Sequence, residues 1–386
     1  MSILWLAVAA FAIGTEAFVI AGLLPVIAAD LQISLAATGQ LVTAYALTYA
    51  IGSPILAVTF NNLDRRAVLA LALCCFIVGN LLAVVAGSAA MLLASRMLMA
   101  IGAGLCMPTA LAVAVAISSP ERRGRAIALV TSGLTVATVL GVPLGTWVGN
   151  HSGWRATFIL VAALGAVALA GLLFGLPRGL PRNTATLGQR LAVARRPSVL
   201  YALSITAFWG IGGFTVFTYL AVPLRDLGLS ATEISLALLV SGIAAAIGNM
   251  LGGTLADRIG PVQTATLGLV IMVMALTLQS ITLKFLPPET ARPVFISLIF
   301  LSGIGGWTFY PGQAANLVQI EPHAAMIALS LNASAMYLGF AVGGVLGGIV
   351  LTALTPGDLG WAAGGGAAAA LALLLLRGWR LRLKTA

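Results

Sequence analysis

The chain has 386 residues, of which 60% are hydrophobic and only 8% are charged. An average soluble chain has roughly 25% charged residues, so a water-soluble globular protein is excluded. The mean hydropathy of +1.08 instead indicates that a lipid bilayer solvates the outer surface. The net charge of +10 does not favour nucleic-acid binding, because the basic residues fall in short clusters between apolar segments, as in membrane proteins.

Twelve apolar segments are long enough to cross about 30 Å of hydrocarbon as helices. The first is too long for a signal peptide and has no basic start, so we expect it to be retained. The predicted spans are residues 4–28, 35–60, 68–86, 89–117, 126–148, 157–176, 200–224, 234–255, 264–283, 294–318, 325–351 and 359–376.

A polar, arginine-rich stretch separates the first six spans from the last six. An even division around one basic linker is typical of internally duplicated transporters. The sequence therefore predicts an all-α integral membrane protein of twelve transmembrane helices, arranged as two pseudo-symmetric six-helix bundles. The bundles are residues 1–176 and 198–386, joined by a linker at residues 177–197.

Positive charge alternates between the connections. Fifteen Lys and Arg residues lie in the even-numbered connections and the C-terminal segment, and four lie in the odd-numbered connections. Because positively charged loops stay on the cytoplasmic side, we expect the linker and both termini to be cytoplasmic, with the protein in the bacterial inner membrane.

Several motifs resemble those of the major facilitator superfamily. Residues 253–260, read GTLADRIG, resemble its loop motif G-x-L-a-D-R-x-G, and residues 95–104 resemble its fourth-helix motif of an Arg followed by glycines. Residues 132–145 resemble the fifth-helix motif of drug and sugar proton antiporters. Residues 15–31 resemble the first helix of the sugar-efflux and chloramphenicol-efflux branch.

The resemblance assigns roles to particular residues. The gating-loop residues would be Asp64, Arg65, Gly253, Asp257, Arg258 and Gly260, and the antiporter-helix residues would be Gly133, Gly141, Pro143 and Gly145. The first loop departs from the family pattern, since Asn61 replaces the expected Asp and Asp64 replaces the second Gly. The inter-domain charge contacts that the family attributes to this loop are therefore not implied here.

Only two ionisable residues lie deep within predicted spans, Glu16 and Arg96. A charge at the bilayer centre costs at least about 2.5 to 3.5 kcal/mol, so such residues are generally functional. Desolvation disfavours the charged form of Glu16, as a proton carrier requires. The alternative is a permanently protonated acid bonded to a carbonyl or to a hydroxyl such as that of Thr43. Arg96 could pair with Glu16, organise nearby carbonyls, or extend to the interface as an anchor.

The glycines of the fifth span share one helix face, which predicts close packing against a neighbouring helix. Pro143 in the same span predicts a local bend. With the family resemblance, this seam would keep the outer end of the cavity sealed.

Aromatic residues concentrate in the seventh and tenth spans. The tenth span also contains Gly305, Gly306, Pro311 and Gly312, which predict a bend or a break. Two tyrosines lie one turn apart on the second span. We expect the substrate cavity to include Tyr45, Tyr49, Trp209, Trp307, Phe309, Tyr310, Gln313 and Asn316.

The sequence contains no metal-ligand cluster, phosphate-binding loop or nucleophile–base pair, so we expect no enzyme, metal or cofactor. The longest connection, of 21 residues, has no room for an ATPase domain. Transport would therefore be driven by an ion gradient or would follow the gradient of the substrate.

The resemblance implies a monomeric, proton-coupled exporter of small, drug-like amphiphilic molecules that works by alternating access, with Glu16 and Arg96 in proton coupling. A sugar or nucleoside exporter is the alternative. A membrane receptor or membrane enzyme would need an extramembrane domain or a catalytic constellation that the sequence lacks.

Overall fold

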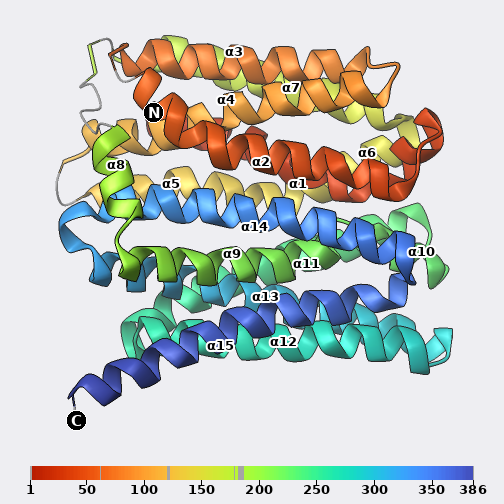
Figure 1. The fold of residues 1–386 in the computed structure, drawn as a ribbon. Coiled ribbons are helices and arrows are strands. Elements are labelled where there is room, and N and C mark those ends of the chain that lie inside the picture. The colour runs from red at the N-terminus through yellow and green to blue at the C-terminus, as the bar shows by residue number, and fades with distance from the viewer. Residues whose placement is uncertain (1, 61, 120–121, 178, 181–186, 386) are drawn as a thin grey trace. The chain divides into compact units, whose positions relative to one another are not determined.

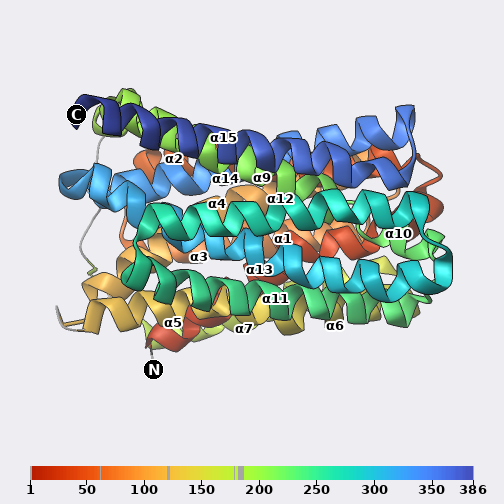
Figure 2. The same ribbon diagram turned by 90° about the horizontal axis from the view of Figure 1, so that it is seen from below.

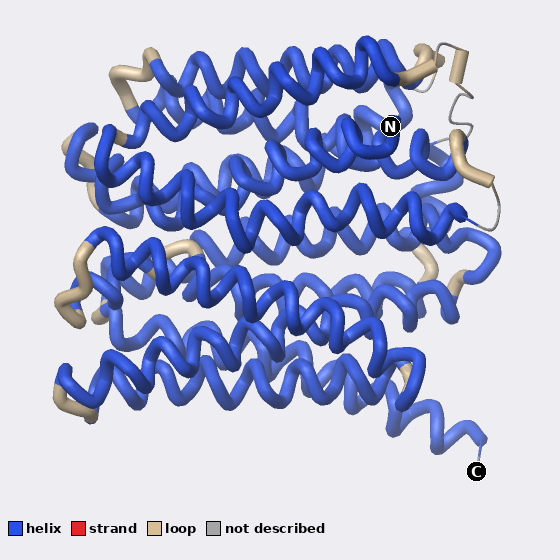
Figure 3. The backbone as a smooth tube through the Cα atoms, turned by 180° about the vertical axis from the view of Figure 1, so that it is seen from behind, coloured by secondary structure: helices blue, strands red, loops and turns tan. Residues whose placement is uncertain are grey.

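The computed structural model describes residues 2–60, 62–119, 122–177, 179–180 and 187–385. Within these ranges every regular element is helical (Figure 3). Twelve helical segments are long and apolar enough to cross a membrane. The predicted all-α class and the predicted number of spans are therefore confirmed.

The chain divides into two compact units, Met1–Arg190 and Leu191–Ala386. The helices of the first unit run side by side and are joined by short turns (Figure 1). They are α1 (Ser2–Leu31), α2 (Leu35–Thr59), α3 (Arg65–Val84), α4 (Ala89–Ala116), α5 (Arg123–Val136), the π-helical turn η2 (Ala137–Gly141), α6 (Val142–Ser152) and α7 (Trp154–Gly175). A short helix, α8 (Leu187–Ala194), forms where the sequence predicted only a polar linker.

The second unit follows the same plan, and Figure 2 shows its helices α11, α12 and α13 side by side. The first span of this unit, which is the seventh of the chain, is interrupted, because α9 ends before a turn that leads into the short α10. The elements are α9 (Pro197–Phe217), α10 (Ala221–Asp226), α11 (Ala231–Ile259), α12 (Pro261–Phe285), α13 (Pro288–Ile320), η3 (Pro322–Ala324), α14 (Ala325–Ala353), η4 (Pro356–Asp358) and α15 (Leu359–Thr385).

Side chains in the turns define where several helices begin. Ser34 and Ser88 accept hydrogen bonds from the backbone N–H groups three residues further on, at the starts of α2 and α4. Ser230 and Glu233 form a reciprocal capping box at the start of α11. These side chains satisfy backbone donors that would otherwise lack a partner, so they fix the boundaries between short turns and long helices.

The first helix, α1, forms the centre of the first unit. In its most apolar window 72% of the residues are buried, whereas the corresponding share is 39% in α2 and in α7. A span that is apolar on all sides and buried on all sides lies inside a bundle rather than against lipid. The single acidic residue in the middle of this helix, Glu16, is therefore held among protein groups.

The fifth span contains an irregular segment at the place where the sequence predicts a bend. The π-helical turn Ala137–Gly141 separates α5 from α6 and ends two residues before Pro143. A proline in a helix removes one backbone hydrogen bond, and the wider π turn accommodates that loss without ending the span.

The tenth span is not broken, contrary to one of the two outcomes that its glycines and proline predicted. Helix α13 is continuous over 33 residues and includes Pro311. A Cβ on Gly305 would lie 2.8 Å from the carbonyl oxygen of Gly268, and one on Gly312 would lie 2.9 Å from that of Pro261. These glycines therefore allow close contact with α12 and do not interrupt the helix.

Candidate functional site

The two ionisable residues predicted deep in the membrane meet in the first unit. The side chain of Arg96, on α4, donates from Nη1 to Oε1 of Glu16, on α1, and both side chains are completely buried. The two residues are 80 positions apart in the chain, so the fold brings them together. The described structure thus contains a buried ion pair at the centre of this unit.

Further contacts hold the guanidinium of Arg96 in place. Nε lies 3.4 Å from the carbonyl oxygen of Leu41, on α2, and Nη1 lies 3.4 Å from the backbone carbonyl oxygen of Glu16. The guanidinium carbon also lies 4.5 Å from the ring centroid of Tyr45. A contact with the face of an aromatic ring and several N–H donors suit an arginine better than a lysine at this position.

The carboxylate of Glu16 is only partly satisfied. Oε1 accepts from Arg96, but Oε2 has no hydrogen-bond partner among the described residues. A buried carboxylate with one free oxygen is costly as an anion unless a cation lies beside it. Arg96 is the cation that compensates the buried carboxylate here.

The antiporter-helix residues pack against α1 on both sides of Glu16. A Cβ added to Gly141 would overlap the hydroxyl of Thr15, the residue that precedes Glu16. A Cβ on Gly145 would lie 2.7 Å from Cγ2 of Val19. A Cβ on Gly133 would overlap the backbone carbonyl oxygen of Ala7. The fifth span and α1 therefore approach as closely as their backbones allow, next to the ion pair.

The gating-loop residues have local roles in the described structure. Asp64 accepts from the backbone N–H of Arg66 at 3.1 Å and from that of Gly179 at 3.3 Å. In the second unit, Gly260 joins α11 to α12 with a φ of 97°, a conformation that favours glycine. Gly253, Asp257 and Arg258 precede it on α11, where both charged side chains are exposed. Asn61 lies outside the described residues.

The predicted cavity aromatics of the second unit form one cluster around Trp209. The ring of Trp209 stacks on Phe309 at 5.3 Å and lies 5.7 Å from Tyr310 and 6.0 Å from Trp307. Its indole N–H donates to the carbonyl oxygen of Gly306 at 2.9 Å. Trp209 and Phe309 are buried, whereas Trp307 and Tyr310 keep part of their surface exposed.

A chain of polar side chains lies beside this cluster. Gln313 donates to the carbonyl oxygen of Ala202 at 2.6 Å and to the hydroxyl of Thr206 at 3.3 Å. Thr206 in turn lies 2.6 Å from Oδ1 of Asn332, and Asn316 donates to Oε1 of Gln313 at 3.1 Å. The chain links α9, α13 and α14 through buried amides and one hydroxyl.

The two tyrosines predicted for the cavity lie in the first unit. Tyr45 is 2% exposed and contacts Arg96, and Tyr49 is 5% exposed one turn further along α2. Tyr45 therefore belongs to the surroundings of the ion pair.

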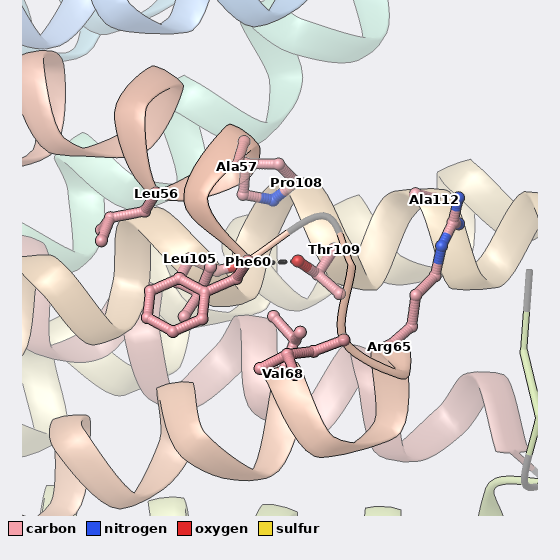
Figure 4. A pocket seen from close by; sticks show the side chains of 10 residues that line it. Leu56, Ala57, Phe60, Arg65, Val68, Leu105, Pro108, Thr109 and Ala112 are labelled. Atoms are coloured by element: carbon pink, nitrogen blue, oxygen red, sulfur yellow. Dashed lines mark hydrogen bonds between the residues drawn. The ribbon is translucent and has the colours of Figure 1, made fainter. Parts of the chain in front are cut away.

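A separate small pocket lies between α2, α3 and α4 in the first unit (Figure 4). Phe60, Val68, Leu105 and Pro108 supply apolar walls, and Arg65 lies at its edge. The hydroxyl of Thr109 is already used, since it donates to the carbonyl oxygen of Leu105 at 2.7 Å. The volume of about 40 Å³ holds a few water molecules at most, so this pocket is too small for an organic substrate.

Two features of the structure were not among the predicted site residues. The sequence did not distinguish Asn332 from the other polar residues within spans. Only the structure shows that this amide is completely buried. Asp30, at the end of α1, accepts from Arg155 at 2.7 Å and from the indole of Trp154 at 3.0 Å. Asp30 thus ties α1 to α7 and does not join the ion pair of Glu16.

Comparisons with known proteins agree on one family. Residues 6–224 and 217–385 each match the sequence model of the Major Facilitator Superfamily. The chain is 32% identical over 367 residues to a chloramphenicol resistance protein of Streptomyces lividans, covering 93% of this chain and 91% of that protein. It is 29% identical over 361 residues to a probable sugar efflux transporter of Haemophilus influenzae, covering 93% and 89% of the two chains.

A solved structure has the same fold. The crystal structure of a D-xylose-proton symporter matches with a TM-score of 0.79 over 96% of each chain, at 18% sequence identity. At this identity the likeness concerns the fold alone.

Proposed function

The chain belongs to the major facilitator superfamily and is a multi-pass membrane transporter, not an enzyme; from this premise we propose that it exports small, drug-like amphiphilic molecules in exchange for protons. The observation that carries the proposal is the buried pair of Glu16 and Arg96, with one carboxylate oxygen left unpartnered. The name of the Streptomyces relative, a chloramphenicol resistance protein, supports a drug-like substrate.

The coupling follows from the two charge states of the pair. With Glu16 ionised, the pair is neutral as a whole, and with Glu16 protonated, Arg96 remains as an uncompensated cation. In this proposal the substrate binds better when Glu16 is ionised, so proton binding and substrate binding weaken each other by equal factors. Exchange between the two ligands then drives export by alternating access of the two halves.

Other predicted residues take supporting roles in this proposal. The seam formed by Gly133, Gly141 and Gly145 holds α1 in place around Glu16 and limits leakage at the outer end of the cavity. The loop residues at the ends of α2 and α11 limit the movement between conformations.

The orientation is part of the proposal. Fifteen positive residues against four favour cytoplasmic termini and a cytoplasmic linker, in the inner membrane of a bacterium. A membrane-impermeant thiol reagent should then label Glu289→Cys, in the first turn of α13, in intact cells, with the unmodified chain as the background. Labelling only after lysis would mean that this residue faces the cytoplasm, and the proposed topology would be wrong.

The central experiment measures chloramphenicol accumulation by proteoliposomes with an imposed pH gradient. Glu16→Gln keeps the side-chain volume but cannot ionise, so it should lose the response to the gradient and keep downhill movement. Glu321→Gln is the matched control, because Glu321 is the other buried carboxylate of the described residues. It pairs with Arg196, which lies between α8 and α9. Accumulation by Glu16→Gln at the unmodified rate would make Glu16 a structural acid.

A sugar exporter is the second candidate function. It is favoured by the chain of buried amides in the second unit, since sugars are bound largely through hydrogen bonds to such groups, and by the name of the Haemophilus relative. Gradient-driven accumulation of a labelled pentose in the same vesicles, with no accumulation of chloramphenicol, would favour this function.

A further inference from the structure

The small pocket of the first unit lies where three membrane spans approach the edge of the bilayer (Figure 4). It is formed by the end of α2, the first turn of α3 and the last turns of α4. Leu105 lies further from the end of α4 than Ala112 does, and both line the pocket. Because spans end at the boundary between hydrocarbon and headgroups, the pocket reaches from the headgroup level into the hydrocarbon region.

The inside of this pocket is apolar. Its larger apolar side chains are Leu56, Phe60, Leu63, Val68, Leu105 and Pro108. The hydroxyl of Thr109 does not change this character, because it donates to a backbone carbonyl oxygen. Leu63 is 46% exposed, so the pocket opens to the surface of the unit. An open apolar pocket at this depth favours an apolar occupant over water.

Arg65 is the one charged residue that lines the pocket. Its side chain is half-buried at the edge and makes no hydrogen bond or ion pair with a described residue. The neighbouring carboxylate of Asp64 accepts instead from the backbone N–H groups of Arg66 and Gly179. Arg65 thus retains five N–H donors and a full positive charge, which favour an anionic partner.

A phospholipid with a net negative charge matches both parts of this site. Phosphate lies at the depth of Arg65, and arginine binds phosphate through two parallel hydrogen bonds. A neutral lipid would leave the half-buried charge without an anion, and a small soluble anion would leave the apolar walls uncovered. The volume of about 40 Å³ admits only a short segment of a lipid chain, while the rest of the lipid stays in the bilayer.

We propose that an anionic phospholipid binds at this pocket, with its phosphate on Arg65 and a short segment of one acyl chain between α2, α3 and α4. The bound lipid joins the ends of the three helices on one side of the first unit. This inference goes beyond the proposed export function, since it depends neither on the substrate nor on proton coupling.

The test is native mass spectrometry of the delipidated full-length protein in detergent, titrated with dioleoyl phosphatidylglycerol. The readout is the dissociation constant of the first bound lipid. Dioleoyl phosphatidylcholine has the same chains and a phosphate but no net charge, so it tests the role of charge. Glycerol phosphate has the anionic group without the chains, so it tests the role of the apolar walls.

Two variants change the site in different ways. Arg65→Gln removes the charge, whereas Ala112→Leu keeps the charge and fills the pocket, and it protects the test against misfolding of the first variant. Arg125→Gln is the matched control, because it removes an exposed arginine of α5 that does not line the pocket. We expect Arg65→Gln and Ala112→Leu each to weaken phosphatidylglycerol binding about tenfold, equivalent to about 1.4 kcal/mol. Arg125→Gln should change it less than twofold.

The unmodified protein should bind phosphatidylglycerol at least fivefold more tightly than phosphatidylcholine. Unchanged phosphatidylglycerol binding in both variants would overturn the site. Weaker binding in Ala112→Leu alone would overturn the role of Arg65, and weaker binding in Arg65→Gln alone would overturn the role of the pocket. Equal affinities for the two lipids would overturn the anionic class, and displacement of the lipid by an equal concentration of glycerol phosphate would show a site for a soluble phosphate.

Discussion

Removal of Arg96 should show how strongly the buried ion pair is coupled to folding. In Arg96→Met the partner of Glu16 is lost, while the apolar stem of the side chain is largely replaced. Both side chains are completely buried, so water cannot replace the lost guanidinium. Breaking a buried pair by removing one partner typically costs about 3 to 5 kcal/mol of unfolding free energy.

The double variant Glu16→Gln/Arg96→Met should recover most of this loss. It has no buried charge left, and replacement of a whole buried pair is often neutral or stabilising. Glu16→Gln alone leaves Arg96 uncompensated among Leu41 and Tyr45, so it should cost more than the double variant. The four proteins form a double-mutant cycle, and its coupling energy should be about 3 kcal/mol in favour of the pair.

The assay is equilibrium unfolding in mixed micelles of dodecyl maltoside and sodium dodecyl sulfate, followed by circular dichroism. A coupling energy below about 0.5 kcal/mol would refute the argument. The contact between Glu16 and Arg96 would then contribute little as an ion pair.

Three further changes test the surroundings. Gly141→Ala should lower both unfolding stability and transport, because its Cβ would overlap α1 and overpacking typically costs about 1 to 3 kcal/mol. Gly365→Ala, on α15, has nothing within 4 Å of the added Cβ and should leave both unchanged. Equal effects of the two changes would contradict the packing seam. Asp30→Asn should change stability by less than about 1 kcal/mol and leave gradient-driven transport intact, since its pair with Arg155 is about 40% exposed; lost coupling would instead make Asp30 the proton carrier. Trp209→Phe removes a buried hydrogen bond and should cost about 1 to 3 kcal/mol in thermal or detergent unfolding, so an unchanged midpoint would mean that this bond is weak.

The sequence alone was sufficient for the number of spans, because the bilayer imposes a length and an apolar composition on each span. It was also sufficient to select Glu16 and Arg96, since an ionisable residue inside an apolar span is rare and costly. The glycines of the fifth span were recognised as a packing face for a similar reason, because the helical period places them on one side.

The tertiary structure decided which groups meet. Glu16 and Arg96 are 80 residues apart, and neither spacing nor composition specifies that their side chains pair or that Oε2 is left over. The glycines of α13 predicted a bend or a break from local propensity, but contacts with α12 use them in a continuous helix. The hydrogen bonds that join Gln313, Thr206 and Asn332 link residues more than a hundred positions apart, so only the fold brings these groups together.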